Sequence, residues 1–334
     1  TALSTSTIIV MSSHHWLLAW LGLELNTLSI LPIIMKSNHP RATEAATKYF
    51  IIQALAAALL LFASIMNAWQ TGQWHISHTT TPLTTTAITL SLMLKLGLAP
   101  MHAWYPEVLQ GTTLSTALII STWQKFAPLT LLYLMTNHLP TNIMLTMGVL
   151  SALLGGWMGL NQTQARKIMA FSSIAHMGWL TTAMALKPTL ALMTLIIYTI
   201  MTAAMFLSLN TTTTKTLTDL GTTWTQTPSL TTLTALTLMS LGGLPPLTGF
   251  MPKWLILNEL CSIKLAPMSI ILALASLPSL YFYIRMTYLI MLTNPPNTTN
   301  TEYKWRFPNH INPTIPPLMM LTVLLLPLTP MLAT

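Results

Sequence analysis

"LGGLPPLTGFMPKW", residues 241–254, lies inside a long apolar stretch and combines glycines and prolines with a lysine, Lys253. Helix breakers and a charge are both costly inside an apolar helix. A similar segment, "LKLGLAPMHAWYPE", occupies residues 94–107, and in each an aromatic residue, a proline and a charge follow a Gly/Pro pair. The pairs are Gly97 with Pro100 and Gly242 with Pro245. The two segments predict two broken helices at corresponding places in the chain.

The composition excludes a water-soluble protein. Of the 334 residues, 52% are apolar and only 6% are charged, whereas a soluble domain carries about 25% charged residues. Apolar runs of about 20 residues recur, and each is long enough as a helix to cross the hydrocarbon core of a bilayer. We therefore expect an all-α polytopic membrane protein.

The candidate spans form a single transmembrane domain over residues 1–334. They are residues 2–13, 15–35, 49–69, 83–106, 113–135, 141–160, 168–186, 189–208, 229–260, 267–292 and 314–333. The first span is short and the chain starts with a threonine, so we expect part of the N-terminal segment to be missing. The fourth and ninth spans contain the Gly/Pro segments and are expected to be broken.

The charges between spans are distributed unequally. If the spans alternate in direction, one side of the membrane carries Lys36, Arg41, Lys48, Arg166, Lys167, Lys215, Lys304 and Arg306. The other side carries only Lys187 and Lys264. Such asymmetry is what the positive-inside rule requires, so it supports the eleven-span topology. The net charge of +8 is accounted for mostly by these loops, and we expect no nucleic-acid partner.

Motifs for cofactor and metal chemistry are absent from the sequence. The single cysteine, Cys261, excludes a disulfide framework and a thiolate-bound cluster within this chain. No GxGxxG, GxxxxGK or HExxH pattern occurs. We therefore predict neither a nucleotide-binding loop nor a bound metal.

Four charges fall inside predicted spans: Glu24, Lys95, Lys125 and Lys253. A charge at a helix centre costs roughly 2.5–3.5 kcal/mol on insertion scales, so a functional use is expected. Breaks beside Lys95 and Lys253 would let water approach a buried amine, because freed backbone groups line a hydrated cavity. A lysine whose charge is easily removed by desolvation suits a proton relay.

Structural alternatives exist for each of these residues. Lys253 could snorkel to the membrane interface, because it is near the end of its span. Glu24 and Lys95 could form a buried structural ion pair. Lys125 has no carboxylate partner in its own span, so a structural role is harder to build for it.

Histidines and the remaining acids complete the candidates. His176, mid-span in "SSIAHMGW", is either a hydrogen-bonded structural residue or part of the relay. His102 lies in the first broken segment and allows the same two interpretations. Glu107 and Glu259 are near span ends, where we expect boundary or network roles.

Four segments carry a resemblance to a known family. They are "HPRATEAATKYF" (39–50), "KLGLAPMHAWYPEVLQG" (95–111), "GGWMGLNQTQARKIMAFSSIAHMGW" (155–179) and "GGLPPLTGFMPKW" (242–254). Over essentially the whole chain, the sequence resembles the antiporter-like membrane subunits of NADH:ubiquinone oxidoreductase (respiratory complex I), in the form found in vertebrate mitochondria. The wider family is also similar to subunits of multi-component cation/proton antiporters.

The resemblance implies a proton-translocating subunit of the inner mitochondrial membrane. It implies an inverted-repeat bundle of eleven helices with a first repeat over about 2–135, a second over about 141–292 and a C-terminal helix over about 314–333. Glu24 would modulate Lys95, Lys125 would pass the proton on, Lys253 would lie toward the exit, and His176 matches a central polar position.

The same resemblance sets expectations for cofactors and partners. NADH, FMN, iron–sulfur clusters and ubiquinone would be bound by other subunits, and this chain would bind none of them. Its partners would be other membrane-arm subunits and membrane lipids, cardiolipin among them. Two alternative functions stay open from the residues alone, namely a stand-alone cation/proton antiporter and a structural scaffold subunit.

Overall fold

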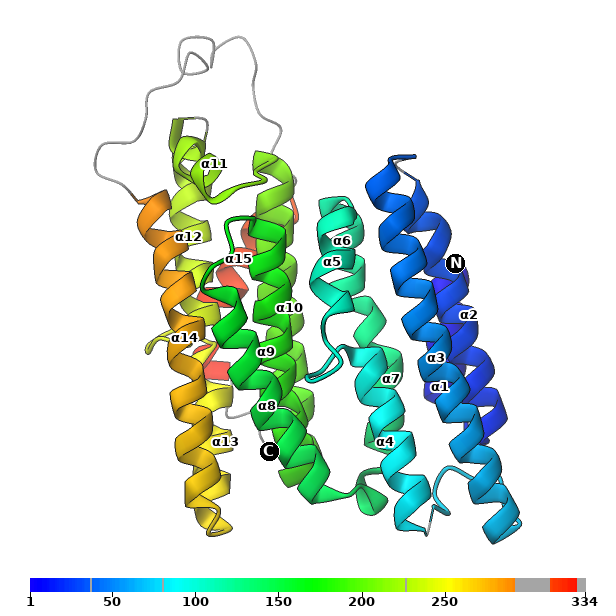
Figure 1. The fold of residues 1–334 in the computed structure, drawn as a ribbon. Coiled ribbons are helices and arrows are strands. Elements are labelled where there is room, and N and C mark those ends of the chain that lie inside the picture. The colour runs from blue at the N-terminus through cyan, green and yellow to red at the C-terminus, as the bar shows by residue number, and fades with distance from the viewer. Residues whose placement is uncertain (37, 80, 226, 292–312, 329–334) are drawn as a thin grey trace. The chain divides into compact units, whose positions relative to one another are not determined.

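The computed structural model describes residues 1–36, 38–79, 81–225, 227–291 and 313–328, which are almost entirely helical (Figure 1). In these ranges no strand forms, and the only β-type pairings are isolated bridges, His15 with His75 and Gln164 with Thr216. Each of the eleven predicted spans contains helix, which confirms the all-helical membrane fold. Lys304, Arg306 and the final residues of the last predicted span lie outside the described residues.

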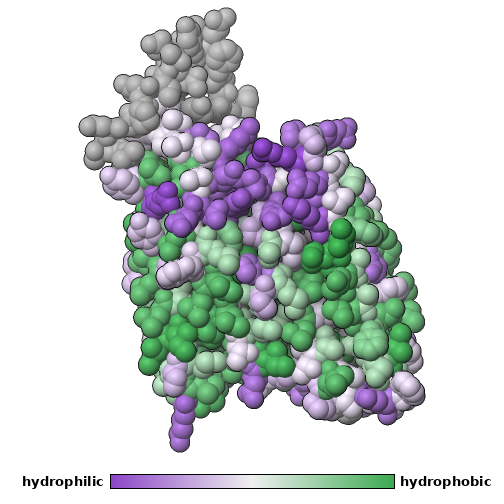
Figure 2. Space-filling model, viewed as in Figure 1, coloured by the Kyte–Doolittle hydropathy of each residue, from purple (hydrophilic) through white to green (hydrophobic). Residues whose placement is uncertain are grey.

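Among the described residues, five helices are long and apolar enough to cross a membrane: α2 (Trp16–Met35), α3 (Pro40–Thr71), α8 (Thr141–Gly159), α10 (Pro188–Thr212) and α14 (Ala266–Ile290). Other predicted spans are shorter helices or are divided into two. The chain separates into two compact units, Thr1–Ser151 and Ala152–Thr334. In Figure 2, hydrophobic side chains cover much of the visible middle of each unit, and hydrophilic ones gather near helix ends.

Unit 1 is organised around α3, which contacts α2, α4 and α5. Its helices are α1 (Ala2–Ser12), α2, α3, α4 (Pro82–Leu96), α5 (Trp104–Gly111), α6 (Leu114–Ser121), η1 (Trp123–Lys125), α7 (Phe126–Leu134), η2 (Thr136–His138) and the start of α8. The buried face of α3 is rich in alanine (Ala42, Ala45, Ala46, Ala56, Ala57, Ala63). Small residues of this kind let membrane helices approach closely.

Helix α3 is longer than the predicted span 49–69. Its 32 residues begin at Pro40, after His39 accepts a hydrogen bond from the backbone N–H of Arg41. Lys48 pairs with Glu44 one turn away, and such i,i+4 pairs support helix beyond the apolar region. Hydropathy alone cannot detect this polar extension.

The predicted break of the fourth span lies between α4 and α5, which Figure 1 shows one above the other. Helix α4 ends at Leu96 and is capped by Gly97, whose φ of 73° is left-handed. The N–H groups of Gly97 and Leu98 return to the carbonyls of Leu94 and Met93 (both 3.1 Å). This pattern is a Schellman motif, which satisfies carbonyls that the end of the helix would leave without partners.

The predicted fifth span, 113–135, is interrupted where we expected a continuous helix. Helix α6 ends at Ser121, the 3₁₀ turn η1 covers Trp123–Lys125, and α7 resumes at Phe126. Pro128 explains the position of the turn, since a proline clashes with the carbonyl four residues earlier, here that of Gln124. Lys125 therefore lies on a break as well.

Unit 2 is organised around α10, which contacts α9, α12, α13 and α15. Its described residues form the end of α8, α9 (Ala165–Leu186), α10, α11 (Leu217–Thr222), η3 (Thr223–Thr225), α12 (Pro228–Gly242), α13 (Phe250–Ser262), α14, α15 (Ile315–Leu324) and η5 (Leu326–Leu328). Helix α14 lies against α12, α13, α9 and α11.

The break between α12 and α13 has the same structure as the break between α4 and α5. The glycine and the proline that match Gly97 and Pro100 each lie one residue later than the sequence comparison placed them. Helix α12 ends at Gly242 and is capped by Gly243 (φ 79°), and the N–H groups of Gly243 and Leu244 return to the carbonyls of Ser240 (2.9 Å) and Met239 (3.4 Å). Gly243, not Gly242, is thus the counterpart of Gly97, and Pro246 is the counterpart of Pro100. The peptide bonds preceding these two prolines are both cis.

Residues 210–218 lie between two predicted spans, but they include the end of α10 at Thr212 and the start of the short helix α11 at Leu217. Thr216 and Asp219 form a capping box in which each side chain accepts the backbone N–H of the other residue. The bond from the Thr216 backbone lowers the pKa of the Asp219 carboxyl, and the Lys215 backbone and charge act in the same direction. Polar caps of this kind start a helix without an apolar run.

Because α5 packs closely on α3, replacing a glycine at the end of α5 should cost more stability than replacing one at the end of α12. A Cβ on Gly111 would lie 2.6 Å from the carbonyl oxygen of Arg41 and 2.7 Å from the Cβ of Ala45, whereas one on Gly242 would meet Tyr283 at 3.7 Å. Gly111→Ala should destabilise the fold by about 1–3 kcal/mol through overpacking. Thermal unfolding of the purified chain in detergent would show this as a lower midpoint, with Gly242→Ala as the matched control. Equal midpoints for the two variants would contradict the packing described.

Candidate functional site

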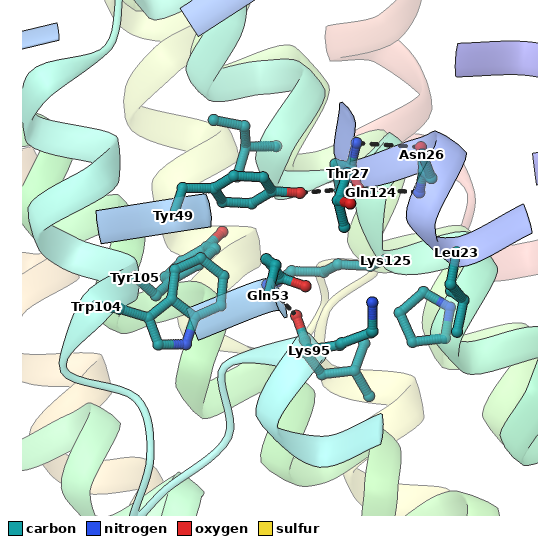
Figure 3. Close-up of a pocket in the computed structure, with 13 residues that line it drawn as sticks. Leu23, Asn26, Thr27, Tyr49, Gln53, Lys95, Trp104, Tyr105, Gln124 and Lys125 are labelled. Carbon is teal, nitrogen blue, oxygen red and sulfur yellow. Dashed lines mark hydrogen bonds between the residues drawn. The ribbon is translucent and has the colours of Figure 1, made fainter. Parts of the chain in front are cut away.

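Two of the predicted lysines enter one cavity in unit 1 (Figure 3). The cavity offers about 20 Å³ to the centre of a water molecule, which is room for at least one water. Its lining residues come from α2, α3, α4, α5, α6, η1 and α7: Leu23, Asn26, Thr27, Tyr49, Gln53, Lys95, Leu96, Trp104, Tyr105, Ile120, Gln124, Lys125 and Pro128. Polar and aromatic groups therefore surround the two amines.

Lys95 lies in the last turn of α4, directly before the break. Its side chain is 7% exposed, and in the ranges that the structure describes its Nζ has no hydrogen-bond partner. Gln53 of α3 donates to the backbone carbonyl of Lys95 at 3.4 Å. An isolated buried amine is costly, so the cavity beside it is the natural place for a solvating water.

Lys125 approaches the same cavity from η1 and is 3% exposed. Its Nζ lies 5.2 Å from the centroid of the Tyr105 ring, within the range of a cation–π interaction. The 3₁₀ turn thus places the Lys125 amine in the same cavity as the Lys95 amine.

Glu24 does not line the cavity, but its neighbour Thr27 does. The Thr27 hydroxyl lies 3.0 Å from Oε2 of Glu24 and 2.8 Å from the Glu24 carbonyl oxygen, and it can donate its proton to either. Ion pairs found among the described residues join Lys48 to Glu44 and Glu107, and Lys187 to Glu259. The alternative of a structural Glu24–Lys95 ion pair is therefore not realised in this structure.

A cluster of uncharged polar residues beside Lys125 was missed by sequence reasoning. Asn26 of α2 and Gln124 of η1 form a reciprocal amide pair, and the Tyr49 hydroxyl donates to Gln124 (Figure 3). Asn26, Gln53 and Gln124 all lie within predicted spans of an otherwise apolar chain. Examining every polar residue in the spans, rather than only the charged ones, would have found them.

Lys253 is the fourth residue of α13, after the second break, and its side chain turns back toward the end of α12. Its Nζ donates to the carbonyl of Gly242 at 2.9 Å and lies 6.0 Å from the centroid of the Trp179 ring. A Cβ on Gly243 would lie 2.9 Å from the same Nζ, so only glycine leaves room for this contact. Lys253 caps the end of α12 and does not snorkel outward.

His176 and Lys253 line one cavity in unit 2, together with Trp179, Tyr198 and Met201. It too offers about 20 Å³ to the centre of a water molecule. Nε2 of His176 lies 3.3 Å from the Tyr283 hydroxyl of α14, and either group can donate, depending on the tautomer. His176 thus combines a structural contact with a place beside a buried amine.

The remaining candidates lie away from the two cavities. Glu107 pairs with Lys48 at 2.7 Å and Glu259 with Lys187 at 2.8 Å, as expected for boundary networks. His102 is buried, with Nδ1 3.2 Å from the carbonyl oxygen of Pro100. The part of the chain that the structure describes contains no group of three histidine, cysteine or acidic residues able to hold a metal.

The sequence matches the family described as NADH:quinone oxidoreductase/Mrp antiporter, TM, over residues 13–293. The chain belongs to this family. A second match, NADH dehydrogenase subunit 2 C-terminus, covers residues 280–333 of this family member.

Curated relatives of this NADH:quinone oxidoreductase/Mrp antiporter family member extend the match to nearly its full length. It is 53% identical over 306 residues to NADH-ubiquinone oxidoreductase chain 2 of Xenopus laevis, covering 92% of this chain and 89% of that protein. The protein of the same name from Salmo salar is 52% identical over 336 residues, covering 100% and 96%.

Solved structures share the fold at low sequence identity. A chain of respiratory complex I from Thermus thermophilus with bound aureothin superposes with a TM-score of 0.86 at 24% identity, covering 99% of this chain and 78% of that one. A chain of the Mrp complex from Dietzia sp. DQ12-45-1b gives 0.81 at 17% identity, covering 94% and 63%.

Because the Lys95 amine has no hydrogen-bond partner among the described residues, a neutral replacement should not lower the stability of the fold. Lys95→Met keeps an unbranched chain of similar length and removes a buried donor that has no hydrogen-bond partner among the described residues, so stability should stay equal or rise by up to about 3 kcal/mol. Lys48→Met, which removes two ion pairs, is the comparison variant. Thermal unfolding in detergent gives both values. A large loss for Lys95→Met would assign this lysine a structural role.

Proposed function

We propose that this chain is a proton-translocating subunit of the membrane arm of NADH:ubiquinone oxidoreductase, located in the inner mitochondrial membrane with other membrane-arm subunits as partners. Membership of the NADH:quinone oxidoreductase/Mrp antiporter family supports the proposal. So do the names of its vertebrate relatives, which are about half identical to it.

The observation that carries the proposal is the pair of buried lysines in one small cavity. Lys95 and Lys125 share a space with room for water, and the Lys95 amine has no hydrogen-bond partner among the described residues. In a low-dielectric interior, charge on one amine disfavours charge on the other. A proton arriving at one lysine therefore favours release from its neighbour, which is the elementary step of a relay.

The surrounding residues suggest how protons reach and leave these amines. In unit 1, the Thr27 hydroxyl joins the Glu24 carboxylate to the cavity wall, which gives Glu24 a hydrogen-bonded connection to it. In unit 2, His176 and Lys253 would form a second site of the relay. The matching breaks favour an internal repeat, with 2–135 and 141–292 as its halves and 314–333 as an added helix, in one transmembrane domain.

Redox chemistry is assigned to other subunits. We expect NADH oxidation, the flavin and iron–sulfur chemistry and ubiquinone reduction to take place there, and this chain to bind no cofactor. Cardiolipin as a bound lipid stays a prediction. The chain's own contribution would be proton transfer through buried side chains coupled to that electron transfer.

Replacing Lys125 tests the relay directly. Lys125→Met should abolish coupled proton translocation in the assembled complex and leave the amount of complex largely unchanged, because it removes a titratable amine while preserving most of the side-chain volume. The measurement is NADH-driven acidification of proteoliposomes, normalised to the amount of intact complex. Undiminished pumping would refute the relay, and a loss of complex without a change per complex would favour a scaffold.

Thr27 tests the connection between Glu24 and the cavity. Thr27→Val is nearly isosteric but has no hydroxyl, so we expect slower proton translocation per complex. Thr27→Ser keeps the hydroxyl and should retain most of the rate. The same assay compares the two variants. If valine and serine behave alike, Glu24 does not act through this hydroxyl.

A further inference from the structure

The amide pair beside Lys125 joins parts of unit 1 that are far apart in sequence. Asn26 Nδ2 donates to Gln124 Oε1 at 3.0 Å, and Gln124 Nε2 donates to Asn26 Oδ1 at 3.2 Å. The Tyr49 hydroxyl also donates to Gln124 Oε1, at 3.4 Å, and the Ser6 hydroxyl donates to Asn26 Oδ1 at 3.4 Å. The cluster thus connects α1, α2 and α3 to the 3₁₀ turn η1.

The geometry of the pair is specific in a way that apolar packing is not. Two side-chain amides that donate to each other fix both the separation and the relative orientation of the backbones that carry them. Asn26 is 2% exposed, and an amide left without a partner in such a place would be costly. Inside a membrane, leucine side chains would fill the same space without that risk, so the amides point to a requirement beyond stability.

The residue that requires a fixed backbone position is Lys125, which follows Gln124 in the chain. Gln124 and Lys125 are consecutive members of η1, a turn whose backbone departs from the α-helix on both sides. A 3₁₀ turn has poorer hydrogen-bond geometry than an α-helix, so it needs an external anchor to hold one conformation. Gln124 provides that anchor on one side, while Lys125 reaches the cavity and the Tyr105 ring on the other.

We propose that Asn26 and Gln124 are positioning residues for proton transfer: their amide pair, braced by Tyr49, holds η1 so that the Lys125 amine stays in the cavity of Lys95. This inference rests on the relay proposed above. Without the pair, η1 can shift, and the separation between the two amines is no longer fixed. Proton transfer through a bridging water depends steeply on that separation.

The test uses the assembled complex in proteoliposomes and four variants of this chain. Gln124→Met keeps length but removes the amide, and we expect proton translocation per complex to fall by about tenfold to a hundredfold, since a misplacement of about 1 Å can cost about a hundredfold in rate. The exchanged pair Asn26→Gln with Gln124→Asn restores a reciprocal amide contact and should recover most of the rate. Asn67→Leu, which removes another buried amide of unit 1 that bonds to the His78 carbonyl, should leave the rate per complex unchanged.

The amount of assembled complex separates positioning from general stabilisation. If Gln124 acts by positioning Lys125, Gln124→Met should lower the rate per complex without lowering the amount of complex. Failure of the exchanged pair to recover the rate would overturn the inference. The inference also fails if Gln124→Met lowers only the amount of complex.

The outcomes distinguish this inference from the function on which it rests. A normal rate for Gln124→Met together with a lost rate for Lys125→Met overturns the positioning role and leaves the relay intact. A normal rate for Lys125→Met overturns both.

Discussion

Backbone N–H and C=O groups buried in a bilayer must form hydrogen bonds inside the protein, so a helix can be interrupted there only if the groups freed by the break find new partners. The same cap supplies these partners at Gly97 and at Gly243. A left-handed glycine turns the chain so that two N–H groups fold back onto the last carbonyls of the half-helix. Any other residue at these positions would have to adopt a φ that L-amino acids rarely tolerate. The glycines therefore allow breaks beside Lys95 and Lys253, and the breaks allow the cavities.

The two units meet the cost of a buried amine in different ways. In unit 2, Lys253 is bonded to a carbonyl at the end of α12, where the helix dipole favours a cation. In unit 1, Lys95 has the cavity but no hydrogen-bond partner among the described residues, and Lys125 has the Tyr105 ring. A site in which one amine lacks a protein partner is a site that needs water, and water is what a proton relay requires. The asymmetry thus favours unit 1 as the place where protons move between lysines.

The sequence predicted the helical spans and both Gly/Pro breaks, because apolar length and helix breakers are local signals. It also identified the lysines that enter the cavities, since charge is conspicuous in a chain with so few charged residues. What it could not give is contact between distant residues. The Asn26–Gln124 pair joins α2 to η1, 98 residues apart in the sequence, and no local sequence pattern predicts it. The interruption at η1 was equally hidden, because Pro128 lies within an apolar run that reads as one helix. The one-residue error at Gly242 arose because adjacent glycines offer two alignments, and only the hydrogen bonds of the cap distinguish them.

Glu107 and Lys253 show how one backbone motif can carry opposite chemistry. With Gly97 aligned to Gly243, both residues are the fourth of the half-helix after the break. From this position Lys253 reaches back to the Gly242 carbonyl, whereas Glu107 pairs with Lys48 of α3. Electrostatics explains the difference, since the carbonyl end of the preceding half-helix attracts an ammonium and repels a carboxylate. An acid at this position therefore turns toward a cation elsewhere. In unit 1 the buried amine comes instead from Lys95, on the half-helix before the break.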